Sequence, residues 1–139
     1  MKNYGITSVS AFLGDMLVYR NLKPLDPRLP AFEDIAPCLG IQPGTTPRKT
    51  EVDYARVMAY LLSYAHGLSG DKEGIKRLIY VGDTELNDGT AFANLCTAGG
   101  WPGVAFIGSE TRDPAAVELI DKSSGRLYLA NRWAMLEDF

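Results

Sequence analysis

The chain has 139 residues, of which 46% are hydrophobic and 22% are charged, and its formal net charge is −3. These proportions are typical of a globular chain, and the length suits one domain, so we expect residues 1–139 to form a single domain. The acidic balance, with an isoelectric point near 5.1, argues against a general nucleic-acid binder, which would carry a basic face. Crossing a bilayer takes about 20 consecutive apolar residues, and no apolar run of the sequence approaches that length. We therefore expect no membrane span.

Two further features bear on the cellular compartment. The first residues, Met1 to Tyr4, lack the charged-then-apolar layout of a signal peptide. The two cysteines, Cys38 and Cys96, form neither a disulfide framework nor a metal-binding spacing. We interpret them as buried, reduced thiols and expect a cytoplasmic protein.

The first apolar run predicts a strand. Residues 6–13, Ile-Thr-Ser-Val-Ser-Ala-Phe-Leu, alternate loosely between apolar and polar side chains, and Gly14 and Asp15 follow directly. Asp15 has two interpretations: a turn residue, since Asp tolerates turn conformations, or a catalytic carboxylate at the end of the strand. Prolines between Asn21 and Pro30 then exclude a long helix, and residues 32–39 predict a short one.

Lys49 stands just before the clearest helix of the chain. Apolar residues recur at helical spacing along residues 50–66 and predict one buried face: Val52, Ala55, Met58, Ala59, Leu62 and Ala65. A lysine in such a loop is ordinarily exposed to solvent. The alternative is that its point charge neutralises a phosphate or a carboxylate.

Residues 77–108 predict a strand, a helix and a second strand. The run at 78–81 is apolar and β-branched, and Gly82 and Asp83 follow it. A helix should then begin near Asp88, bury Ala91, Phe92, Leu95 and Cys96, and end at Gly99-Gly100, before a strand at 104–107. In a parallel unit of this kind, Asp83 would lie at the carboxyl edge of the sheet, where open α/β sheets bind ligands.

Asp83 and Asp88 allow two interpretations. They can cap the helix and complement its dipole, which favours negative charge at the N-terminus. Alternatively they hold Mg²⁺, which takes one or two carboxylates and keeps several waters.

The rest of the chain continues the alternation of strands and helices. Asp113 and Pro114 predict the start of a helix that includes Val117, Leu119 and Ile120, because proline favours the first helical position. A strand at 127–130 and a closing helix at 133–139 follow. We therefore expect an α/β fold with a mainly parallel sheet flanked by helices, in which strands near 5–13, 78–82, 103–107 and 127–130 lie side by side.

One stretch resembles a known family. GDTELND, residues 82–88, lies between a hydrophobic strand and a helix, and it resembles the fourth motif of the haloacid dehalogenase-like (HAD) superfamily. Pro47-Arg48-Lys49 resembles the third motif, and residues 104–108 and 125–136 resemble the strands and helix that follow. The resemblance covers residues 45–139 and implies a single Rossmann-like domain without a separate cap domain.

The first motif of that family is degenerate in this chain. In members of the family, the first strand ends in an Asp-x-Asp pair. In this chain, residues 12–18, Phe-Leu-Gly-Asp-Met-Leu-Val, contain only one carboxylate. Either Phe12 and Gly14 stand at the two positions, or Asp15 is the nucleophile and Leu17 replaces the acid. A further alternative is that residues 5–8 form the family's second strand. The Asp-x-Asp pair is not found, so the resemblance leaves catalysis open.

The resemblance nevertheless implies site residues. Asp83, Asp88 and Asp15 would bind Mg²⁺, Lys49 would contact the phosphate, and Asp15 would be the catalytic carboxylate. The implied function is that of a Mg²⁺-dependent phosphatase, a hydrolase acting on a small phosphorylated substrate. The alternatives are a catalytically impaired HAD-like domain with a binding or regulatory role, and a response-regulator-like or other doubly wound domain. Without a cap domain, a partner chain would complete the cleft. A homodimer is therefore one expected arrangement.

Overall fold

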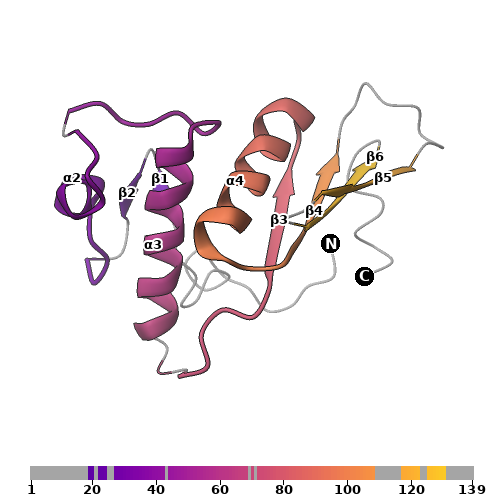
Figure 1. Cartoon of the computed structure of the whole chain (residues 1–139). Helices are drawn as coiled ribbons and strands as arrows, with labels where there is room; N and C mark the ends of the chain where they lie inside the picture. Colours follow the sequence, from indigo (N-terminus) through magenta and orange to yellow (C-terminus); the bar gives the residue numbers. More distant parts are fainter. Residues whose placement is uncertain are drawn as a thin grey trace, which may run out of the picture.

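Figure 1 shows the computed structural model of the chain. The structure describes residues 19–20, 22–24, 27–42, 44–68, 70, 72–108, 117–122 and 125–130. Helices and a mixed sheet alternate along this part, which gives the α/β class that the sequence predicts. The predicted strand at 5–13, Asp15 and the predicted helix at 133–139 lie outside the described residues. In the described part, no helix combines the length and the apolar character that a membrane span needs.

Four strands make the main sheet. They are β3 (Leu78–Gly82), β4 (Gly103–Gly108), β5 (Val117–Lys122) and β6 (Gly125–Ala130), and their order across the sheet is β3-β4-β6-β5. β3 runs parallel to β4, and β4 runs parallel to β6, so their carboxyl ends share one edge. The strands predicted at 78–82, 103–107 and 127–130 are thereby confirmed as neighbours in one sheet.

β5 corrects one prediction. Residues 117–120 were expected in a helix after Pro114, but they belong to a strand that pairs antiparallel with β6, with Lys122 opposite Gly125. The residues before the strand carry a helix-start signal, whereas Val117 to Ile120 form a short, mostly apolar run interrupted by Glu118. Such a run suits a strand equally well when a neighbouring strand completes its hydrogen bonds.

Two helices pack between the sheet and the described residues that precede α3. α3 (Val52–Leu68) and α4 (Thr90–Gly99) lie side by side (Figure 1), and Ala55 and Ala59 of α3 contact Leu95 of α4 in one apolar cluster. Alanines at this contact let the two helix axes approach closely. α4 covers the sheet through Phe92 and Cys96, which pack on β4 side chains. Both helices and the buried face of α4 were predicted from their periodicity. The predicted face of α3 is correct at Ala55 and Ala59, but Val52 in its first turn is exposed, and Val57 and Leu61 are buried because the helix packs on two sides.

The segment before α3 packs against the other side of that helix. β1 (Tyr19–Arg20) and β2 (Lys23–Pro24) form a short antiparallel pair, and α2 (Phe32–Ile35) and η1 (Pro37–Leu39) follow. Their apolar residues join Val57 and Leu61 of α3 in a cluster: Leu22, Phe32, Ile35, Ala36 and Ile41. Cys38 of η1 is exposed, so the prediction of a buried thiol is wrong there, whereas Cys96 of α4 is buried as predicted. The chain then runs to the N-terminal end of α3, where Lys49 lies.

Candidate functional site

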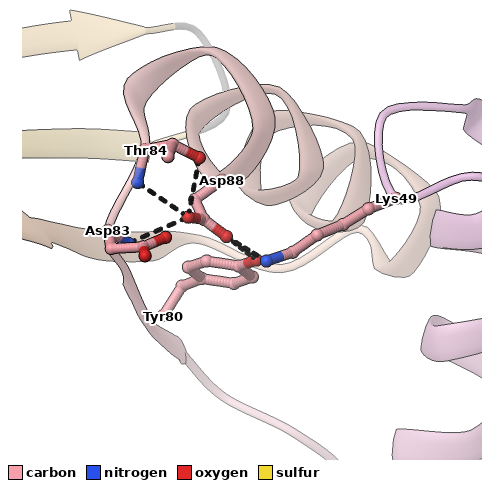
Figure 2. Close-up of polar contacts among 5 residues, drawn as sticks. All are labelled: Lys49, Tyr80, Asp83, Thr84 and Asp88. Carbon is pink, nitrogen blue, oxygen red and sulfur yellow. Dashed lines mark hydrogen bonds and ion pairs between the residues drawn. The ribbon is translucent and has the colours of Figure 1, made fainter. Parts of the chain in front are cut away.

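Asp88 lies where β3 passes into α4 (Figure 2). It belongs to η2 (Glu85–Gly89), a π-helical turn that leads into α4, and only 1% of its side chain is exposed. Oδ2 accepts hydrogen bonds from the backbone N–H groups of Asp83 and Thr84, both at 2.9 Å, and from the Thr84 hydroxyl at 3.1 Å. The turn after the strand thus surrounds one carboxylate oxygen with donors.

The other carboxylate oxygen joins two distant parts of the chain. Oδ1 of Asp88 accepts a hydrogen bond from the Tyr80 hydroxyl at 2.9 Å and forms an ion pair with Nζ of Lys49. Nζ also lies 5.8 Å from the centroid of the Tyr80 ring, a distance at which a cation is attracted to the face of an aromatic ring. Residues from β3, from η2 and from the segment just before α3 therefore meet at one carboxylate, as Figure 2 shows.

Gly82 makes room for this arrangement. A Cβ at position 82 would lie 2.3 Å from Cγ and 2.4 Å from Cβ of Asp88, far inside contact distance. The Asp88 side chain thus folds back against the backbone at the end of β3. In the GDTELND stretch, glycine is the residue that permits this close approach.

The charges of the site reinforce one another. Burial alone raises the pKa of Asp88, but hydrogen bonds from Lys49, the turn and Tyr80 outweigh it and hold that pKa well below its usual range. Partial burial lowers the pKa of Lys49, yet its hydrogen bonds to Asp88 and Tyr80 outweigh burial, and the pKa rises above its usual value. Burial raises the pKa of Tyr80 to about 12. Asp88 and Lys49 are therefore charged, and Tyr80 is a neutral donor, at neutral pH.

The structure brings the side chains of two of the predicted site residues into contact. It brings Lys49 and Asp88 into contact although 39 positions separate them in the sequence. Asp83 lies at the same edge of the sheet with an exposed side chain, as the sequence predicts, whereas Asp15 lies outside the described residues. Sequence reasoning missed Tyr80 and Thr84. Alternate residues of a strand share one face, so Tyr80 lies on the same face as Gly82, against which Asp88 packs. This periodicity is the sequence signal that could have identified Tyr80 as a site residue.

Asp83 and Asp88 differ in how they fit a metal ion. The exposed carboxylate of Asp83 suits Mg²⁺, which binds through one or two carboxylates and keeps several waters. Asp88 does not fit as a direct ligand in this arrangement. A carboxylate offers about four lone-pair positions, and five donors surround this one, an ammonium group among them. Within the described residues, no group of three or more His, Cys, Asp or Glu side chains is arranged to hold a metal.

A small cavity lies beside the site. It measures about 60 Å³ and is lined by residues of α3, β3 and α4: Tyr54, Ala55, Met58, Tyr80, Ala91 and Leu95. Its lining is mostly apolar, so it suits a short aliphatic group rather than a phosphate or a metal ion. The polar candidate site is therefore the carboxyl end of β3, where Lys49 and Asp83 are accessible.

Comparisons with known proteins do not assign a family. No family model, no curated protein and no solved structure matches this chain. The HAD-like resemblance stays a prediction, and the site is interpreted from its own contacts.

Proposed function

We propose that the chain is a HAD-like hydrolase, a Mg²⁺-dependent phosphatase that acts on a small phosphorylated substrate. The observation that carries this proposal is the contact of Lys49 with Asp88 at the carboxyl end of β3, beside the exposed Asp83. A fixed cation and an accessible carboxylate at the ligand-binding edge of a parallel sheet are the groups that a phosphoryl group and its metal ion require.

Lys49 is the anion-binding group of this proposal. Its side chain is 46% exposed, so the ammonium group remains within reach of a ligand although it pairs with Asp88. An ammonium carries three N–H donors, and the ion pair with Asp88 leaves capacity for phosphoryl oxygens. Because Asp88 is held by four further hydrogen bonds, the position of its partner Lys49 is defined before a ligand arrives.

Asp83 is the residue that would hold Mg²⁺. Bound there, the ion would neutralise charge on the phosphoryl oxygens. Asp15 is the carboxylate that the sequence offers as nucleophile. Its oxygen would form a bond to phosphorus as the alcohol leaves, and water would then hydrolyse the aspartyl-phosphate.

A catalytically impaired binding domain is the second candidate. Two observations favour it: residues 12–18 contain one carboxylate where the family has two, and hydrogen bonds already occupy both oxygens of Asp88. Such a domain would bind a phosphorylated ligand at Lys49 and release it unchanged.

Turnover of p-nitrophenyl phosphate and a panel of sugar phosphates with Mg²⁺ distinguishes the two candidates. For a hydrolase we expect slow turnover that Asp15→Asn abolishes and that Lys49→Ala and Asp83→Asn weaken. Removal of a nucleophile typically costs several orders of magnitude in rate. The matched controls are Glu33→Gln and Lys23→Ala, which remove one exposed charge each outside the site and should leave the rate unchanged.

Each result has a defined consequence. Turnover that persists in Asp15→Asn contradicts the proposed mechanism. No turnover, with phosphate binding that depends on Lys49, supports the binding domain instead of the hydrolase. A wild-type protein that neither turns over these compounds nor binds Mg²⁺ or inorganic phosphate refutes both candidates.

A further inference from the structure

We propose that Asp88 is the fixed counter-ion of Lys49 rather than a metal ligand, and that Tyr80 is the positioning residue of this ion pair. Cation binding and anion binding are then divided between two residues: Asp83 takes the divalent cation, and Lys49 takes the phosphoryl group. The ligands named here rest on the proposed function, whereas the roles of Asp88 and Tyr80 rest on the contacts within the chain.

The surroundings of Asp88 are those of a counter-ion. Its side chain is 1% exposed, and its two oxygens accept hydrogen bonds from two backbone N–H groups, two hydroxyl groups and one ammonium group. A metal ion could reach Oδ1 only by displacing Lys49, and it would then face a like charge at short range. The buried carboxylate instead obtains its compensating positive charge from Lys49.

Asp88 is also held from several sides, which suits a positioning role. Its Oδ2 is held by donors of the turn itself, and Gly82 lets the side chain lie directly against the end of β3. Lysine has a long and flexible side chain, and ordering it costs conformational entropy. A partner held by four other hydrogen bonds therefore favours one position of the Lys49 ammonium.

Tyr80 connects this pair to the core of the domain. Its ring contacts the ring of Phe92 in α4, with centroids 6.1 Å apart, and Phe92 is fully buried. Its hydroxyl donates to Oδ1, the same oxygen that Lys49 contacts, and its ring lies beneath Nζ. Tyr80 thus contacts both members of the ion pair, and its packing on Phe92 holds its side chain in place. It is not a metal ligand in this proposal.

Affinities for Mn²⁺ and for inorganic phosphate test the division of roles. Mn²⁺ prefers the same oxygen ligands as Mg²⁺, and free Mn²⁺ is counted directly by electron paramagnetic resonance; phosphate binding is followed by calorimetry. Asp83→Asn should weaken Mn²⁺ binding about tenfold or more, whereas Asp88→Asn and Tyr80→Phe should leave it within about twofold. Lys49→Met, Asp88→Asn and Tyr80→Phe should each weaken phosphate binding, by about tenfold for Lys49→Met.

Tyr60→Phe is the matched control for Tyr80→Phe. It removes a hydroxyl from an exposed tyrosine of α3, and both affinities should stay unchanged. Tyr80→Phe keeps the ring that packs on Phe92, so it remains informative even where Asp88→Asn fails to fold. Mn²⁺ affinity that falls as far in Asp88→Asn as in Asp83→Asn overturns the inference, and so does a phosphate affinity that Tyr80→Phe leaves unchanged.

A wild-type protein that binds neither probe refutes the proposed function, and the roles of Asp88 and Tyr80 are then decided by a double-mutant cycle in urea. The cycle combines Lys49→Met with Asp88→Asn, in the wild-type and in the Tyr80→Phe background. Shifts of the unfolding midpoint that are non-additive, and whose non-additivity shrinks without the Tyr80 hydroxyl, support the inference. Additive shifts, or a coupling that Tyr80→Phe does not change, overturn it.

Discussion

Replacing Asp88 by Asn should destabilise the protein more than any other single change at the site. Asn keeps the shape of the side chain but exchanges one acceptor oxygen for an NH₂ donor. If the amide places NH₂ toward the turn, it meets the backbone N–H groups of Asp83 and Thr84. If it turns the other way, it meets the donors of Tyr80 and Lys49. Neither orientation satisfies the donors that surround this buried position.

The magnitude follows from the bonds that are lost. At least two donors lose their acceptor, each at a cost of about 1–3 kcal/mol, and the negative charge that pairs with Lys49 disappears. We expect Asp88→Asn to lower the free energy of unfolding by about 3–5 kcal/mol, the combined cost of these losses. Lys49→Met should cost only about 1–2 kcal/mol. The lysine is 46% exposed, and Asp88 keeps its four other donors.

Urea unfolding followed by circular dichroism measures both values, provided that the slope against urea is the same in all variants. Asp83→Asn is the matched control, because it removes an exposed carboxylate five positions away and should change the free energy of unfolding by less than about 0.5 kcal/mol. The reasoning is refuted if Asp88→Asn costs less than about 1 kcal/mol, or less than Lys49→Met.

Three other predictions concern the site and the core. Gly82→Ala should cost about 1–3 kcal/mol in urea unfolding, because the added Cβ would lie 2.3 Å from Cγ of Asp88; an unchanged midpoint would contradict this contact. The unfolding free energies of wild-type protein and Asp88→Asn should differ by a constant amount between about pH 5 and 7 and converge below about pH 4. The Asp88 pKa is lowered from 3.8, so its stabilisation is present above that value and is lost as the pH falls; a gap that is constant down to pH 2 would contradict it. Ellman's reagent should modify exposed Cys38 in the native protein and reach Cys96 only on unfolding, because Cys96 is buried and burial raises its pKa to about 11; two equivalents of fast reaction would show that Cys96 is accessible.

Local patterns were sufficient for most of the elements around the site. The helical spacing of apolar residues predicted α3 and α4, and short apolar runs before Gly82 and Gly108 predicted β3 and β4. These patterns act between near neighbours in the sequence, where the period of a helix or a strand decides which side chains share a face. They failed at Val117 to Ile120, because a short, mostly apolar run suits either element and the pairing with β6 decides between them.

The sequence by itself determined that Asp83 and Asp88 follow a strand and open a helix, and that Lys49 precedes another helix. It left open whether the carboxylates cap the helix or bind a metal, and whether the lysine has a partner. The packing of α3 on α4 decided the question of the lysine's partner, because it brings Lys49 to Asp88 across 39 positions, a contact that no local period encodes. Burial then separated two carboxylates that look alike in the sequence. Asp83 faces solvent, whereas the turn and Tyr80 enclose Asp88, whose negative charge is paired with the lysine.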